Sequence, residues 1–150
     1  MTWKKRIISA VVPALLFTLL ILPAVPVSAE YLNQAVTNTN DPDYWLDRGG
    51  LFATYGSYSA ALKAYRKALD LDAGNSKAYY NMALAHAELG DFDPALSEID
   101  KAISLDPESG RYYYGRAWIF LRAGKKAEAE KDFKKAAELG NSDARAYLNQ

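Results

Sequence analysis

The sequence predicts an all-α protein, an α-solenoid of three tandem helix-turn-helix repeats with a short C-terminal capping helix. Three observations predict this fold: residues of one kind recur every 34 positions, apolar residues inside each interval have helical spacing, and capping residues separate the intervals. One such repeat cannot bury its apolar faces alone and becomes stable by stacking on its neighbours. The recurring residues are the glycines Gly56, Gly90 and Gly124 and the aromatics Trp45, Tyr79, Tyr113 and Tyr147.

The first 29 residues have the pattern of a signal peptide. Lys4, Lys5 and Arg6 are followed by an apolar run over residues 7–22 and by small residues that end at Ala29. A basic start, an apolar run of this length and a small-residue cleavage site are typical of secretory leaders, and we expect cleavage after Ala29. The alternative is an uncleaved signal-anchor. Both predict a domain outside the cytoplasm, either periplasmic or secreted, or anchored in the inner membrane.

Residues 30–41 are polar and predict a tether, and the repeats follow as units 42–75, 76–109 and 110–143. In each unit, a glycine is expected to end the first helix in a left-handed conformation, after which the second helix begins. Residues 144–150 begin a fourth unit and predict a partial capping helix. The residues expected to cap the helices that open the units are again 34 positions apart: Asp41, Asn75, Ser109 and Asp143.

These positions closely resemble the signature of the tetratricopeptide repeat family. The signature residues of the first unit are Trp45, Arg48, Gly49, Phe52, Ala61, Tyr65 and Ala68; those of the second are Tyr79, Met82, Ala83, His86, Ala95, Ile99, Ala102 and Pro107; those of the third are Tyr113, Arg116, Ala117, Phe120, Ala129, Phe133 and Ala136. The small residues would let paired helices approach closely. Arg48 and Arg116 replace a leucine of the family, and we expect each to bury its stem and reach a carboxylate, Glu98 or Asp132 in the case of Arg116.

The resemblance implies a concave groove lined by the first helix of each unit. Tyr80, Tyr114 and Trp118 are expected to be exposed together there, as large amphipathic side chains that dominate binding hot spots. Basic residues are expected at the edge of the groove, which favours an acidic partner. The predicted partner-binding residues are Leu46, Lys77, Tyr80, Asn81, Leu84, Arg111, Tyr114, Trp118, Leu121 and Arg122.

Some members of the family clamp the terminal carboxylate of a chaperone peptide with basic and asparagine side chains. Only Asn81 matches that set well, Arg111 is a conservative match, and Leu46, Gly50 and Gly115 occupy the other three positions. The sequence therefore favours an extended peptide with apolar or aromatic anchors over a carboxylate clamp.

Other function classes lack sequence support. The chain has no cysteine, its 18 basic and 18 acidic residues balance, and it has one histidine, His86, at a position where the family packs an aromatic. We therefore expect no metal, no cofactor, no nucleic acid and no enzymatic activity. Membrane contact is expected only if the leader is uncleaved. The predicted function is that of an exported, non-catalytic scaffold or adaptor in the bacterial envelope, and the alternative is a self-associating structural subunit of an envelope complex.

Overall fold

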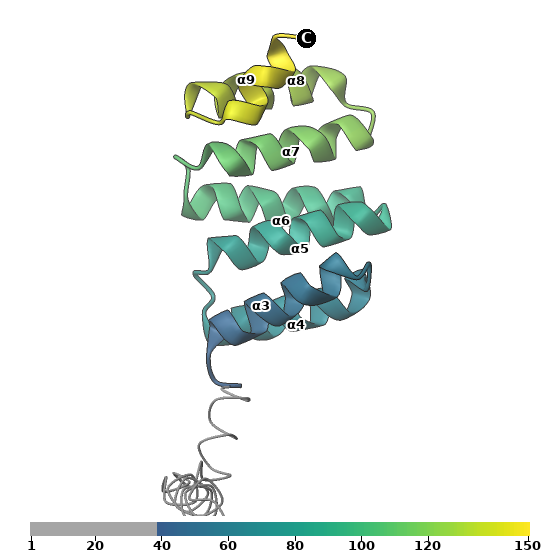
Figure 1. The fold of residues 1–150 in the computed structure, drawn as a ribbon, viewed down its shortest axis with the longest axis vertical. Coiled ribbons are helices and arrows are strands. Elements are labelled where there is room, and N and C mark those ends of the chain that lie inside the picture. The colour runs from purple at the N-terminus through teal and green to yellow at the C-terminus, as the bar shows by residue number, and fades with distance from the viewer. Residues whose placement is uncertain (1–38) are drawn as a thin grey trace, which may run out of the picture. The chain divides into compact units, whose positions relative to one another are not determined.

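The computed structural model describes residues 39–150, so the predicted leader and most of the predicted tether lie outside the described residues. Within residues 39–150 all regular structure is helical, as predicted (Figure 1). The helices, in chain order, are α3 (Pro42–Thr54), α4 (Tyr58–Leu71), α5 (Ser76–Leu89), α6 (Phe92–Leu105), α7 (Gly110–Arg122), α8 (Lys126–Glu138) and α9 (Ser142–Leu148).

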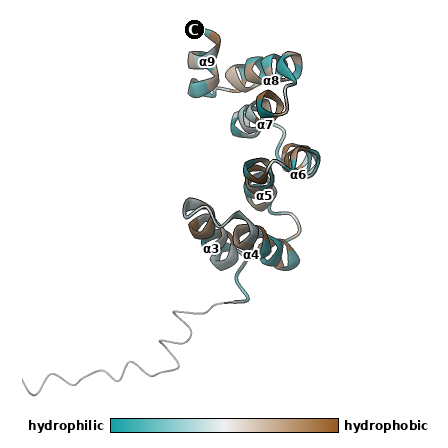
Figure 2. Cartoon of the chain, turned by 90° about the vertical axis from the view of Figure 1, so that its right-hand side faces the viewer, coloured by the Kyte–Doolittle hydropathy of each residue, from teal (hydrophilic) through white to brown (hydrophobic). Residues whose placement is uncertain are grey.

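The helices stack as consecutive hairpins. Helix α3 packs on α4, α5 on α6 and α7 on α8, and each hairpin also contacts the next one through α4 and α5 or through α6 and α7. The hairpins follow one another from α3–α4 to α9 in Figure 2. Because α5 also contacts both α3 and α7, the first helices form a continuous row along one side of the stack, which we call the inner row.

Glycines end the first helix of each hairpin as predicted. Gly56, Gly90 and Gly124 have φ values of 71°, 84° and 78°, a left-handed conformation that side chains with a Cβ adopt only at a cost. The chain therefore reverses direction at the same place in each unit.

Two of the four expected N-caps form as predicted. Asp41 accepts a hydrogen bond from the amide of Asp43, and Asn75 accepts one from the amide of Ala78. Ser109 occupies the N-cap position of α7 without a side-chain hydrogen bond.

The expectation that Asp143 caps the last helix is wrong. Asn141 is the N-cap of α9, and its side-chain oxygen accepts a hydrogen bond of 2.8 Å from the amide of Ala144. The reason is the turn before it: α8 ends at Glu138, Gly140 follows in the left-handed conformation with a φ of 91°, and this tight turn starts α9 two residues earlier than a strict repeat would.

The predicted packing positions form the core. Ala61, Ala95 and Ala129 have no exposed surface, so the second helix of each hairpin lies close against the first. The large side chains one turn later, Tyr65, Ile99 and Phe133, are at most 2% exposed.

Arg116 holds two acidic residues from different helices. Its guanidinium donates to both carboxylate oxygens of Asp132 in α8, at 2.6 and 2.9 Å, and to Asp100 in α6 at 2.5 Å. The hydrogen bonds with Asp132 and then with Asp100 outweigh desolvation and raise the pKa of Arg116. The expected pairing with Asp132 is confirmed, whereas the expectation of Glu98 is wrong, because Asp100 reaches the guanidinium instead.

Arg48 behaves differently from Arg116. It donates to the hydroxyl of Tyr44 at 3.2 Å and lies over the ring of Phe52 at 5.4 Å. Among residues 39–150 no carboxylate lies within ion-pair distance of it, so the expectation that Arg48 reaches one is wrong for this part of the chain.

Candidate functional site

All ten predicted partner-binding residues lie on the inner row. Leu46 comes from α3, and the other nine come from the two helices that follow it in the row. The members on α5 are Lys77, Tyr80, Asn81 and Leu84, and those on α7 are Arg111, Tyr114, Trp118, Leu121 and Arg122.

Trp118 is the most exposed large aromatic of this set. Its side chain is 41% exposed, yet its ring meets those of Tyr114, Phe133 and Tyr147 edge-on, with centroids 6.2, 5.7 and 5.8 Å away. Three aromatic neighbours fix the orientation of the indole and leave one part of it open to solvent.

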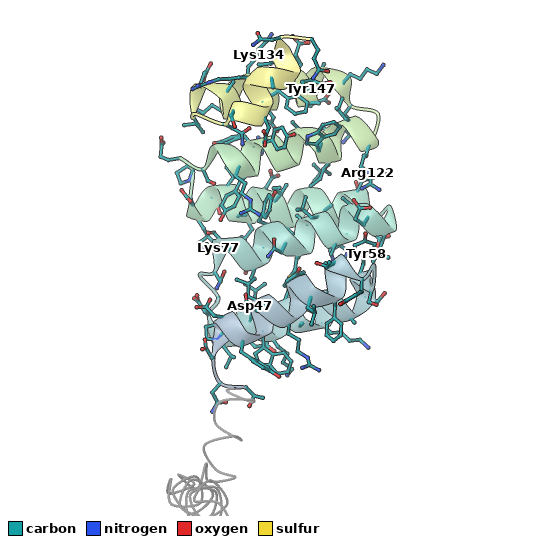
Figure 3. The ribbon with its side chains drawn as sticks, viewed as in Figure 1. Asp47, Tyr58, Lys77, Arg122, Lys134 and Tyr147 are labelled. Carbon is teal, nitrogen blue, oxygen red and sulfur yellow. The ribbon has the colours of Figure 1, made fainter. Side chains whose placement is uncertain are left out.

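Tyr147 belongs to this aromatic group although the sequence did not predict it as a site residue. Its ring stacks on Phe133 with centroids 4.0 Å apart, and Figure 3 shows it near the C-terminal end of the stack. Tyr147 also lines a shallow hollow of about 430 Å³ together with Leu121, Lys126, Glu130 and Leu148. The available signal is the 34-residue series of aromatics, which ends at Tyr147.

The expectation that Tyr80 is exposed beside Tyr114 and Trp118 is wrong. Tyr80 is only 8% exposed, and its ring lies 5.2 Å from that of Tyr112. The space for it exists because residue 115 is a glycine: a Cβ there would lie 2.7 Å from the Tyr80 ring. The guanidinium of Arg111 covers the ring at 4.7 Å. At this position of the inner row, the solvent therefore contacts the guanidinium of Arg111 and not the ring of Tyr80.

The remaining predicted residues divide into half-buried and exposed ones. Leu46, Asn81, Leu84, Tyr114 and Leu121 are half-buried, and the three leucines also pack against the core. Lys77 and Arg111 are exposed and stand at equivalent positions of neighbouring units.

Arg122 forms an ion pair with Glu88, which the sequence did not single out. The two residues are one repeat length apart, on α7 and α5, and both are about half exposed. Equivalent positions in adjacent repeats lie side by side, so two opposite charges 34 residues apart in the sequence could have predicted this ion pair. The pair bridges two helices of the inner row, and Figure 3 shows Arg122 at the edge of the stack.

His86 is half-buried in α5, with its Nδ1 3.6 Å from the carboxylate of Asp91. Within residues 39–150 no group of three or more histidine, aspartate or glutamate side chains is arranged to hold a metal ion. In the same range, no helix has both the length and the apolar character needed to cross a membrane.

The fold and the inner row define an α-solenoid built from helical hairpins. Two family models match it: one described as a tetratricopeptide repeat over residues 80–144, and one described as a TPR repeat over residues 49–90. The chain belongs to the tetratricopeptide repeat family. Comparison with curated proteins gives no match.

Solved structures of this family superpose on the chain. The first TPR of Spaghetti (RPAP3) bound to the HSP90 peptide SRMEEVD is 26% identical, with a TM-score of 0.67 over 75% of this chain and 91% of that one. MamA is 28% identical, with a TM-score of 0.63 over 73% of this chain and 60% of its own. The translocator chaperone SycD of Yersinia enterocolitica, at 20% identity and a TM-score of 0.67 over 72% of this chain and 87% of that one, shows the shared fold alone. The family and the peptide-bound RPAP3 structure support a protein-interaction scaffold, and such modules are typically non-catalytic.

Proposed function

We propose that this protein is an exported adaptor that binds a peptide segment of a partner protein along the inner row, with Trp118 as the main anchor. The observation that carries the proposal is the indole of Trp118, which stays 41% exposed while three aromatic rings fix it. A rigid, partly exposed tryptophan loses little entropy when a ligand covers it, and such residues dominate binding energies.

Other predicted residues of the inner row suit an extended peptide. Asn81 is half-buried on α5, and its amide can both donate to and accept from a peptide backbone. Leu84 on α5 and Leu121 on α7 are half-buried and offer apolar surface on the inner row. A segment with an aromatic or aliphatic anchor fits these side chains.

The charges near the inner row favour an acidic segment. Lys77 and Arg111 are exposed on α5 and α7. The related TPR of RPAP3 is bound to a peptide, SRMEEVD, that contains two glutamates and an aspartate. The present chain lacks most of a carboxylate clamp, since Leu46 packs against the core and Gly115 is buried under Tyr80. We therefore propose recognition of side chains along the segment in place of its terminal carboxylate.

The proposed export depends on the leader over residues 1–29. Cell fractionation combined with mass measurement of the purified protein tests it. A periplasmic or secreted product that begins at Glu30 supports a cleaved leader, and a full-length product in the membrane fraction supports the signal-anchor. Cytoplasmic full-length protein contradicts export.

The binding proposal is tested by in-cell crosslinking followed by affinity capture, with the native chain compared with Trp118→Ala. The matched control is Leu105→Ala at the end of α6, because Leu105 is equally exposed, at 42%, but lies outside the inner row. Loss of a hot-spot residue weakens binding by at least about 2 kcal/mol, or roughly 30-fold, so the partner should be lost from the Trp118 variant alone. Equal capture by all three proteins contradicts the proposal, and capture of only a second copy of the chain indicates a self-associating subunit.

A further inference from the structure

The first hairpin has an open hollow that the proposed peptide site does not use. It measures about 660 Å³ and lies between α3 and α4, whose side chains project from this end of the stack (Figure 3). Its apolar part is formed by Trp45, Phe52, Ala60 and Ala64, and its charged part by Arg48, Lys63, Arg66, Lys67 and Asp70.

The third hairpin shows what covers the equivalent surface when a helix precedes it. Tyr113, Arg116 and Phe120 of α7 stand two repeat lengths after Trp45, Arg48 and Phe52. There α6 packs on α7: Tyr113 lies against the cluster that contains Ile99 and Ile103 of α6. Asp100 of the same helix accepts a hydrogen bond from Arg116. An amphipathic helix that places the carboxylate of Asp100 against the arginine is therefore the covering element of this surface within the same molecule.

The first hairpin has the arginine without the acidic residues. The position of Asp132, which holds Arg116 from within its own hairpin, is occupied by Ala64 in the first hairpin. Arg48 consequently donates only to the hydroxyl of Tyr44 among the described residues. The guanidinium of Arg48 is therefore available to a carboxylate of a segment that covers the hollow.

The charge around the hollow selects the kind of occupant. Four cations, Arg48, Lys63, Arg66 and Lys67, face one carboxylate, Asp70, which pairs with Lys67 at 3.7 Å. Two copies meeting through this face would bring eight cations together, and like charges at an interface cost several kcal/mol. An acidic helix neutralises them and covers the apolar floor.

We propose that the hollow between α3 and α4 docks an amphipathic, acidic α-helix of a partner protein, with an aspartate or glutamate of that helix against Arg48 and apolar side chains on Trp45 and Phe52. This surface belongs to the first hairpin, whereas Trp118 belongs to the third. The protein would accordingly hold two partner segments, a peptide on the inner row and a helix at the N-terminal end of the stack.

The test uses the covering helix of the molecule itself as the probe. A fluorescent peptide with the sequence of residues 91–106 is held helical by a staple between positions 93 and 97, which are exposed in α6. Its binding to the full chain is measured by fluorescence anisotropy. We expect saturable binding that Arg48→Glu weakens by about tenfold or more. A peptide with Asp100→Arg should bind the native chain weakly and the Arg48→Glu chain better, because the charges are then exchanged.

Two controls separate the possible results. Arg48 is exposed and its contacts with Tyr44 and Phe52 lie at the surface, so Arg48→Glu should leave the helical circular dichroism unchanged and lower the melting temperature only slightly. Trp118→Ala should leave binding of the stapled peptide unchanged, which makes this test independent of the proposed inner-row site. Absence of saturable binding, binding that ignores the charge exchange, or binding lost only with Trp118→Ala would overturn the proposal.

Two other segments could occupy the hollow: residues 30–38 of the same chain, and a second copy of the chain. A photo-crosslinker placed at residue 63 of the full chain in cells distinguishes them from a partner protein. Crosslinks to a separate protein, through an acidic helical segment of that protein, support the proposal. Crosslinks to residues 30–38 of the same chain, or to a second copy, overturn it in favour of that occupant.

Discussion

Gly49 in α3 lies so close to the ring of Tyr65 in α4 that a β-carbon at residue 49 would overlap the phenol carbons. Tyr65 is 2% exposed, so its ring has no free direction in which to move. The packing of α3 on α4 therefore requires a residue without a side chain at position 49. The adjacent Gly50 serves as a comparison, because no atom lies within 4 Å of the position that its β-carbon would take.

Alanine at these two glycines should have opposite effects. Alanine favours a helix over glycine by about 1 kcal/mol, and Gly50→Ala should gain most of this. Gly49→Ala gains the same amount but forces Tyr65 out of place, and overpacking of this kind costs about 1–3 kcal/mol or more. Urea unfolding should show a higher midpoint for Gly50→Ala and a lower one for Gly49→Ala. A stabilised Gly49→Ala protein would mean that the ring has room to shift.

Removal of Arg116 should destabilise the third hairpin strongly. Arg116→Met leaves the carboxylate of Asp132, which is 7% exposed, without its partner. Breaking a buried ion pair from one side costs about 3–5 kcal/mol, and the low end applies here because the guanidinium is partly exposed. The double variant Arg116→Met/Asp132→Leu should recover most of this loss. Urea titrations of the four proteins give the coupling energy, and additive losses would rule out the pair as the cause.

The ion pair between Arg122 and Glu88 should matter much less for stability. Both side chains are more than 40% exposed, and exposed pairs typically contribute about 0–1 kcal/mol. Glu88→Gln should shift the urea midpoint only slightly, and 0.5 M salt should remove the difference from the native chain. A shift as large as that of Arg116→Met would contradict this estimate.

Tyr65 should make stability fall at alkaline pH. Burial raises the pKa of its phenol above the ordinary value of 10.0. The folded protein therefore keeps the proton over a range in which the unfolded chain has lost it. The corresponding stability is fully present below about pH 10 and is lost as the pH rises through the folded pKa. The free energy of unfolding of the native chain should be lower at about pH 11 than at about pH 9, and the difference should be smaller for Tyr65→Phe. An identical decrease in both proteins would assign the effect to other groups.

Most of the fold could be predicted from the 34-residue period of the sequence. A 34-residue step fixes which residues face the partner helix, so the burial of Ala61, Ala95 and Ala129 and the left-handed Gly90 could be predicted without coordinates. The side-chain caps formed by Asp41 and Asn75 could also be predicted, because each cap involves only residues close in sequence.

What could not be predicted depends on departures from the repeat. Tyr80 is buried because Gly115, in the next unit, leaves space above it, and the family pattern contains no information about this pair. The hollow of the first hairpin follows from two further differences, Ala64 in place of an aspartate and no described helix before α3. The burial of Tyr80 depends on a residue of the next unit, and the hollow depends on a residue that differs between equivalent hairpins, so the repeat pattern of a single unit predicts neither.

The main contacts of each helix in this stack are with helices one or two places away along the chain, and this affects how the protein is made. Contacts between residues close in sequence form quickly, so folding does not have to wait for the C-terminus. During synthesis, the α3–α4 hairpin can pair as soon as residue 71 has emerged, and each later helix then adds to a surface that is already formed. The first hairpins can therefore assemble before the last helices have been made, and α9 is the last helix to pack on Phe133 of α8.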